Sequence, residues 1–256
     1  MPDVRLPRRR FLALGAASLL FSGCDRLSEA PNFKEFLASA EWLTYGVQRR
    51  LGGDHALARE FTVEDVSPVF KVNGTTMPEG EDYAALREGD FAAWRLRVDG
   101  LVTNPVEFSL ADLRNLPQRI QITRHDCVEG WSAIGKWRGV PLAIVLERAA
   151  LLPAARFVVF HCADILERTL DGTGQYYESI DLIDAFHPQT ILAHSLNDVP
   201  LSVGHGAPLR LRVERQLGYK HAKYVMCIEL TDRLDGFGRG KGGYWEDRGY
   251  EWYAGI

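Results

Sequence analysis

Cysteine is scarce in this sequence, and the scarcity narrows the classes of protein that it can encode. Four cysteines occur among 256 residues, at positions 24, 127, 162 and 227. A disulfide-stapled scaffold is smaller and much richer in cysteine. No C-x-x-C, H-E-x-x-H or C-x-x-C-H spacing is present, which argues against a zinc site and against covalently attached heme.

Excess positive charge and long apolar runs are also missing. The formal net charge is −4, and the basic residues form no stripe or aromatic-basic repeat, so we expect no nucleic-acid partner. After Cys24 no apolar run is long enough to span a membrane. With 46% hydrophobic residues in 256 positions, the chain can bury one good-sized core.

The N-terminus has the features of an export signal. Residues 8–12 read Arg-Arg-Arg-Phe-Leu, and the stretch from Phe11 to Gly23 carries no charge. Twin arginines before a short apolar region are typical of the Tat signal, so residues 1–23 predict a periplasmic protein. Residues 21–24 resemble a lipobox with Phe21 where leucine is usual. Lipidation of Cys24, ordinary cleavage and an uncleaved anchor all stay open.

The rest of the chain predicts a linker or packing arm over residues 24–58 and one mixed domain over residues 59–256. Residues 32–50 have helical apolar spacing, and residues 73–90 are expected to be irregular. Short helices are expected at 109–113 and 141–151, and strands at 94–100, 157–160, 209–213 and 224–230. The strand at residues 157–160 should be buried on both faces, and the strand at residues 209–213 should be buried on one face only. Helices and strands without regular alternation indicate an α+β fold.

Cys127 is the residue for which the sequence most clearly indicates a chemical role. It lies in the run Thr123–Trp131, close to Arg124 and His125. Nearby cations favour a thiolate, the form that binds a soft metal. The alternative is a small buried side chain, which is the fate of most free cysteines. The glycines and proline of residues 135–142 predict a tight loop that faces a ligand and leads into a helix.

Three segments resemble the sulfite oxidase superfamily, in particular the catalytic subunit of the bacterial methionine sulfoxide reductase system. They are the Cys127 run, residues 205–211 (His-Gly-Ala-Pro-Leu-Arg-Leu) and residues 217–223 (Leu-Gly-Tyr-Lys-His-Ala-Lys). The resemblance implies a mixed sulfite oxidase-type molybdopterin-binding fold in a single domain. Many members add a C-terminal immunoglobulin-like dimerisation domain. The chain stops at Ile256, so we expect that domain to be absent and the protein to be a monomer.

The resemblance also implies a molybdenum–molybdopterin cofactor with Cys127 as the protein ligand of the metal. Relatives have asparagine in place of His205 and threonine in place of Cys162. Ordinary structural roles stay open for these positions, including a buried strand cysteine, a structural histidine and an Asn-Gly turn. The cofactor contacts that the resemblance implies are those of Asn73, Cys162, His205, Arg210, His221, Ala222 and Lys223.

Two charged residues near Cys127 are candidates for catalysis. Glu129 matches the family motif, whereas Arg124 is inferred from spacing alone and could instead pair with Asp126 or Glu129. The aromatic tail over residues 242–253 would expose too much apolar surface if free. It is expected to cover the mouth of the site, to form a docking surface or to join the core. Residues 187–190 are interpreted as a structural turn.

The sequence therefore predicts an exported molybdenum oxidoreductase that reduces an S- or N-oxide, such as a small or protein-bound sulfoxide. The residues that follow Cys127 include Glu129 and no cation, and a carboxylate repels the sulfite dianion. Because heme and Cys-cluster motifs are lacking, electrons are expected from a separate protein, and the resemblance implies a membrane heme subunit fed by quinols. A sulfite oxidase-like dehydrogenase and a non-catalytic cofactor-binding or electron-relay lipoprotein are the alternatives. A zinc site and a Cys127–His125 hydrolase have less support.

Overall fold

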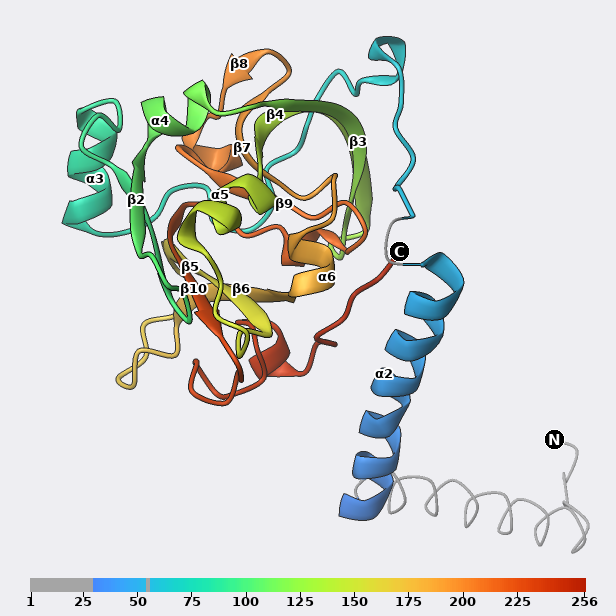
Figure 1. The fold of residues 1–256 in the computed structure, drawn as a ribbon. Coiled ribbons are helices and arrows are strands. Elements are labelled where there is room, and N and C mark those ends of the chain that lie inside the picture. Colours follow the sequence, from blue (N-terminus) through green and yellow to red (C-terminus); the bar gives the residue numbers. More distant parts are fainter. Residues whose placement is uncertain (1–29, 54–55) are drawn as a thin grey trace, which may run out of the picture. The chain divides into compact units, whose positions relative to one another are not determined.

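A computed structural model describes residues 30–53 and 56–256 (Figure 1). One compact unit ends at Leu51 and the second comprises Gly52–Ile256. Helix α2 spans Pro31–Gly52, which confirms the predicted helix, and Gly53 then adopts a left-handed conformation with φ 66°. No helix among the described residues is long and apolar enough to cross a membrane. The predicted signal and Cys24 lie outside the described residues.

A five-stranded sheet forms one side of the second unit. Its strands are β1 (Arg95–Gly100), β2 (Val106–Ser109), β5 (Phe157–Ile165), β6 (Gln175–Asp181) and β10 (Val225–Thr231), in the order β2-β1-β10-β5-β6. Only the β1–β10 pair is parallel. Strand β10 is central, as predicted from its β-branched and aromatic residues.

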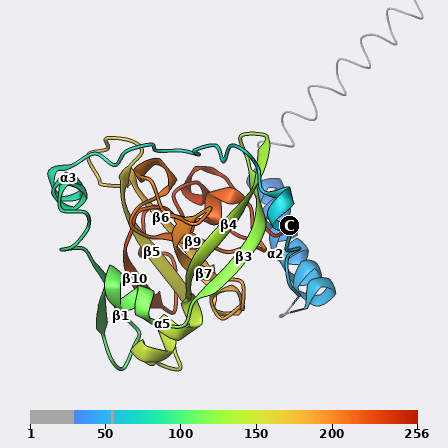
Figure 2. The same ribbon diagram turned by 90° about the horizontal axis from the view of Figure 1, so that it is seen from above.

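A second sheet contains β3 (Arg119–Cys127), β4 (Trp131–Pro141), β7 (Ile191–Leu196) and β8 (Val199–Pro200), and β9 (Arg210–Arg212) pairs with β7. Figure 2 shows β3 and β4 on one side of the domain and β5 and β10 on the other, with β7 and β9 between them. All three β9 residues are buried. The prediction of one exposed face for this strand was therefore wrong.

Of the loop predicted at residues 135–142, residues 135–141 are instead part of strand β4, and Leu142 begins helix α5 (Leu142–Ala149), the helix into which the loop was predicted to lead. Burial alternates along β4, and this strand pairs with both β3 and β7. Gly139 permits a close approach of strands rather than a turn, because a Cβ there would overlap the Leu192 carbonyl group. The glycines were misread because close strand packing and turns select the same residue type.

Four short helices complete the domain: α3 (Glu81–Glu88), α4 (Leu110–Asn115), α5 (Leu142–Ala149) and α6 (Leu182–Ala185). The predicted helices correspond to α4 and α5. A capping box starts α4, because Asp112 N donates to Ser109 Oγ at 3.1 Å and Ser109 N donates to Asp112 Oδ2 at 2.9 Å. Helix α3 lies where irregular structure was predicted. Buried Tyr83 stabilises it by donating its hydroxyl to the Ala207 carbonyl at 2.6 Å.

The main hydrophobic core lies against the five-stranded sheet and includes Leu96, Val158 and Ile228 together with α5. A smaller cluster surrounds Trp137, which is fully buried beside Phe70 in the second sheet. The ends of β3 and β5 and the segment that follows β9 lie beside one another at the edge of these two clusters. That edge is where the site forms.

Candidate functional site

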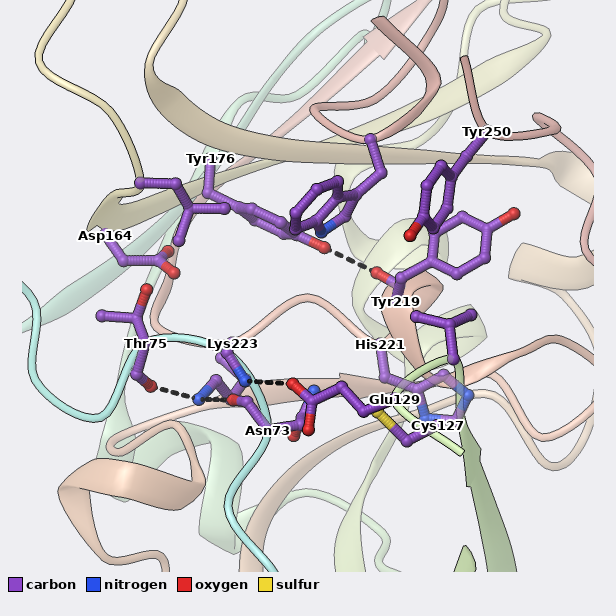
Figure 3. A pocket seen from close by; sticks show the side chains of 14 residues that line it. Asn73, Thr75, Cys127, Glu129, Asp164, Tyr176, Tyr219, His221, Lys223 and Tyr250 are labelled. Carbon is purple, nitrogen blue, oxygen red and sulfur yellow. Dashed lines mark hydrogen bonds between the residues drawn. The ribbon is translucent and has the colours of Figure 1, made fainter. Parts of the chain in front are cut away.

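A cavity of about 200 Å³ opens between the two sheets (Figure 3). Five segments distant in sequence supply its walls: a loop before α3, the β3–β4 turn, the end of β5 with β6, the segment after β9, and the C-terminal tail. The lining residues are Asn73, Gly74, Thr75, Cys127, Val128, Glu129, Asp164, Leu166, Tyr176, Tyr219, His221, Lys223, Trp245 and Tyr250.

Cys127 and Glu129 come together at one end of the pocket. Cys127 is the last residue of β3, and a turn closed by Gly130 N donating to the Cys127 carbonyl at 3.0 Å leads into β4. Gly130 has φ 84°, which a residue with a side chain rarely adopts. The Glu129 carboxylate accepts from Trp131 Nε1 at 2.9 Å. Both side chains line the cavity, as the sequence predicted.

Burial affects the pKa of Cys127 more than the nearby cations do. Burial raises the pKa of the Cys127 thiol, and the positive charges of Lys71 and Arg210 offset this only in part. The prediction that neighbouring cations favour the thiolate was therefore wrong for the chain alone, because desolvation outweighs them. A bound metal ion would itself supply the charge that removes the proton.

Arg124 lies away from the pocket. Alternate residues of β3 are buried, so the side chains of Thr123 and His125 face inward while Arg124 faces outward with 55% of its side chain exposed. Its Nε pairs with Asp126 Oδ2 at 2.9 Å. The period-two alternation of a strand places residues 124 and 127 on opposite faces. The structure thus favours the ion-pair alternative over a catalytic role for Arg124.

Lys223 reaches the pocket wall and clamps a loop there. Its ammonium group donates to the carbonyl oxygens of Asn73 at 2.6 Å, Thr75 at 2.5 Å and Gly204 at 2.9 Å. Asn73 therefore contributes its backbone to this clamp. Since an ammonium group has three N–H donors, Lys223 shapes the pocket and carries no donor to spare.

Arg210 is fully buried on β9 and is not among the residues that line the pocket. Its Nη1 donates to the His205 carbonyl at 3.1 Å, whereas Nε and Nη2 have no partner among the described residues. The guanidinium carbon lies 5.0 Å from the centre of the Trp137 ring. Burial lowers the pKa of Arg210 to about 9, and Arg212 contributes to this shift. Buried, unpaired N–H donors on a cation fit the phosphate of a cofactor, which a guanidinium group can bind at two points.

His221 lines the pocket and adjacent Ala222 supports it. His221 Nε2 bonds to the Gln216 carbonyl at 3.0 Å, and its buried Nδ1 has no partner among the described residues. Burial lowers the pKa of His221 well below its ordinary value, so the ring is neutral. The Ala222 carbonyl accepts from Leu211 N at 2.8 Å, which joins this segment to β9. A neutral imidazole with a free nitrogen fits a polar pterin.

Cys162 and His205 do not line the pocket. Cys162 is buried in the main core, opposite Val225 in the strand register. His205 uses both ring nitrogens elsewhere, one with Ser202 Oγ at 2.7 Å and one with the Phe70 carbonyl at 2.9 Å. The structure thus favours structural roles for both side chains, although the His205 carbonyl holds Arg210 in place.

Asp164 is a pocket residue that the sequence analysis missed. It is buried at the end of β5, its Oδ1 has no partner among the described residues, and burial raises its pKa to about 6. Figure 3 shows it beside Thr75, at the end of the pocket away from Cys127. The available indication was a single acid after an apolar strand, which is too common a pattern to indicate a site.

Aromatic side chains line the pocket on the side of the tail. Trp245 stacks on Tyr250 with ring centroids 5.3 Å apart, and Tyr250 meets the edge of Tyr219 at 5.2 Å. We call Tyr219, Trp245 and Tyr250 the aromatic wall. Two of these residues belong to the tail, so the tail supplies part of the pocket wall. Tyr244 joins the core, and His187 is buried away from the pocket, bonded to the Ala56 carbonyl.

Within residues 30–53 and 56–256, no three His, Cys, Asp or Glu side chains converge in an arrangement that could hold a metal ion. A metal at Cys127 would therefore take its other ligands from a separate group. Together with the unpaired polar atoms of Arg210, His221 and Asp164, this composition fits a cofactor that carries its own metal ligands, a phosphate and a polar ring.

The chain is similar to several known proteins. Residues 83–236 match the family described as oxidoreductase molybdopterin binding domain. The chain is 37% identical over 255 residues to a protein of Azospira oryzae provisionally named protein-methionine-sulfoxide reductase subunit YedZ1, covering 100% of this chain and 88% of that protein. It is 30% identical over 238 residues to the protein-methionine-sulfoxide reductase catalytic subunit MsrP of Xanthomonas campestris, covering 89% and 70%. The sulfane dehydrogenase SoxCD structure from Paracoccus pantotrophus aligns with TM-score 0.49 and 22% identity, covering 56% and 39%.

Proposed function

This chain belongs to the oxidoreductase molybdopterin-binding domain family of the sulfite oxidase superfamily, and on that premise we propose that it reduces a sulfoxide. The family assignment confirms the resemblance seen in the sequence, the predicted fold and an enzymatic role as a molybdopterin oxidoreductase. The names of two relatives, protein-methionine-sulfoxide reductase subunits in Azospira and Xanthomonas, support the finer choice of substrate.

The charge of the pocket carries the proposal. Lys223 is the single cation among the lining residues, and its donors are taken by backbone carbonyls. Glu129 and Asp164 are acidic, and the aromatic wall is apolar. Such a pocket repels a doubly charged anion such as sulfite and suits a neutral sulfoxide, whose methyl and sulfur groups pack favourably against aromatic rings.

The residues present fit the cofactor. Cys127 would hold the molybdenum, the unpaired N–H groups of Arg210 would take the phosphate, and His221 and Asp164 would contact the polar pterin. When bound, the cofactor supplies two-electron transfer to and from the substrate. Reduction of a sulfoxide consumes two electrons and two protons and releases a sulfide and water. Glu129, beside Cys127, is the carboxyl group placed to hold and deliver a proton at Oε1 or Oε2.

The electron source and the cellular location belong to the same proposal. The sequence has no heme or iron–sulfur motif, so a separate membrane heme subunit fed by quinols supplies the electrons. The twin arginines support Tat export of the folded, cofactor-loaded chain to the periplasm, with Cys24 as the residue that lipidation would modify. The substrate is a small or protein-bound sulfoxide, and the enzyme acts as a monomer.

Steady-state kinetics test the direction of the reaction. Purified enzyme matured with molybdopterin is assayed with reduced viologen and methionine sulfoxide, and separately with sulfite and ferricyanide. We expect sulfoxide reduction to be the faster reaction by orders of magnitude in kcat/KM. Faster sulfite oxidation would overturn the proposal. Binding of cofactor without turnover of either substrate would support the electron-relay alternative instead.

A further inference from the structure

Behind the aromatic wall lies a fully buried group of three charged side chains. Lys220 Nζ pairs with Glu178 Oε2 at 2.5 Å and with Glu246 Oε1. None of the three is more than 3% exposed. Lys220 belongs to the segment after β9, Glu178 to β6 and Glu246 to the C-terminal tail. We call these residues the buried triad.

Each member of the triad is close in sequence to a residue of the pocket wall. Lys220 stands between Tyr219 and His221, and Glu246 follows Trp245 directly. Glu178 is two residues after Tyr176, so both point to the same side of β6. Tyr176 donates its hydroxyl to the Tyr219 carbonyl at 2.6 Å. The triad therefore joins the two segments that carry the aromatic wall to β6, which carries Tyr176.

The triad also has a definite proton content. One ammonium group faces two carboxyl groups, so the group carries a net negative charge unless one proton is held. Burial and the neighbouring Glu246 raise the pKa of Glu178 well above its ordinary value. Glu178 Oε1 and Glu246 Oε2 lack a donor, and both lie where a Cβ on Gly243 would fall. A shared proton there makes the triad neutral, and Gly243 leaves the room for it.

From this arrangement we propose that the buried triad is a positioning unit that fixes the C-terminal tail and thereby the aromatic wall, so that it sets the affinity of the enzyme for its substrate. The triad does not touch substrate or cofactor. It acts through Trp245 and Tyr250, which the tail carries, and through Tyr219. The role of the wall in binding a sulfoxide rests on the proposed function, whereas the anchoring of the tail does not.

Removal of one carboxyl group distinguishes this role from general stabilisation. In Glu246→Ala, Lys220 keeps Glu178 as a partner, so no buried charge is left uncompensated. Other contacts still attach the tail, such as Trp252 Nε1 with Ser179 Oγ at 2.8 Å and Tyr177 with Asp247 at 2.8 Å. The variant should therefore fold, with a local loss of order at the wall.

Glu246→Gln is the conservative counterpart. The glutamine carbonyl can accept from Lys220, and its amide can donate to the free oxygen of Glu178. This arrangement is neutral without a shared proton. Glu167→Gln is the matched control, because Glu167 also binds the tail, through Arg248 at 2.7 Å, but with 53% of its side chain exposed. Exposed ion pairs contribute little.

The test measures hydrogen–deuterium exchange of the full-length protein and sulfoxide reduction kinetics for the three variants. In Glu246→Ala we expect exchange of residues 242–253 to rise on the order of tenfold, with β5 unchanged. We expect KM for methionine sulfoxide to rise about tenfold while kcat stays within about twofold. Glu246→Gln and Glu167→Gln should match the wild type in both measurements.

Three results would overturn the anchoring of the tail by the triad. They are unchanged tail exchange in Glu246→Ala, equal effects of the Ala and Gln variants, and faster exchange that extends through β5, which would indicate a purely global effect. A changed tail with an unchanged KM would equally remove the link to substrate affinity. If the wild-type enzyme reduces no sulfoxide, the proposed function fails, and the exchange data still decide whether the triad anchors the tail.

Discussion

Arg212 donates from Nη1 to Nδ1 of His125 at 2.9 Å, in the interior of the second sheet. Because arginine is always a donor, Nδ1 of His125 must be the acceptor and the ring proton lies on Nε2. Burial and the positive charge of Arg212 lower the pKa of His125 well below its ordinary value. A neutral imidazole therefore lies two residues before Cys127, held by a cation that also pairs with Glu214 at 2.5 Å.

Loss of Arg212 should destabilise the domain strongly. Both members of the Arg212–Glu214 pair have fully buried side chains. Arg212→Met would leave the Glu214 charge uncompensated, and we expect the free energy of unfolding to fall by about 3–5 kcal/mol. Urea denaturation followed by circular dichroism measures this. The control is Arg168→Met, whose exposed pair with Glu79 should change stability by less than about 1 kcal/mol. Similar values for the two variants would contradict the importance of burial.

Arg210 should matter for the cofactor and not for folding. Its unpaired, buried N–H groups cost stability in the empty protein, so Arg210→Met should leave the apoprotein equally stable or more stable. Each lost charge-assisted hydrogen bond to phosphate weakens binding by about 1.5–3 kcal/mol. Pterin fluorescence after denaturation measures retained cofactor, and outward-facing Arg124→Met is the control. Full pterin content in Arg210→Met would refute this assignment.

Cys127→Ala should abolish turnover and change the molybdenum spectrum. Among residues 30–53 and 56–256 no other cysteine lines the pocket, and a thiolate is the soft ligand that the metal needs from the protein. Absorption spectroscopy of the molybdenum centre and the viologen assay measure the two effects. Cys227→Ala is the control, because Cys227 lies on β10 near Asp99 and should keep both properties. Normal turnover of Cys127→Ala would invalidate the site.

Asp164 predicts a pH dependence of apoprotein stability. Its pKa is raised from 3.8 to about 6 by burial, so the folded state binds the proton more tightly than the unfolded state. The stabilisation is complete below pH 4 and is lost as the pH rises to about 6. Asp164→Asn lacks this loss and should be more stable at pH 7 by up to about 3 kcal/mol. Urea titrations between pH 4 and 7 measure the difference. A constant difference across that range would show that Asp164 does not titrate there.

The export prediction is tested by replacing Arg8 and Arg9 with lysine. The twin arginines are read by a receptor, and charge alone does not replace them. We expect the variant to accumulate in the cytoplasm, whereas replacement of Arg5 with lysine should leave export unchanged. Cell fractionation and immunoblotting measure the distribution. Normal periplasmic levels of the double variant would mean that residues 1–23 are not a Tat signal.

Local patterns in the sequence were sufficient for several elements and for the family. The cap at Ser109, the helix after Pro141 and the central strand at residues 225–231 depend on neighbouring residues, and so does the Cys127 run that indicated the cofactor. The same local reasoning failed at residues 135–142, because glycine serves both turns and close strand contacts. It failed at helix α3, where the buried contact of Tyr83 with the Ala207 carbonyl stabilises a short helix.

The roles of individual polar residues depended on three-dimensional neighbours. Strand parity separates Arg124 from the pocket, three backbone carbonyls occupy Lys223, and Asp164 enters the site from the end of a distant strand. The buried triad joins residues 178, 220 and 246. A sequence pattern records which groups are available over a few residues. Burial, pairing and charge compensation arise only when segments distant in the chain come within hydrogen-bonding distance. The family could therefore be predicted from the sequence, whereas the roles of the individual pocket residues could be assigned only from the fold.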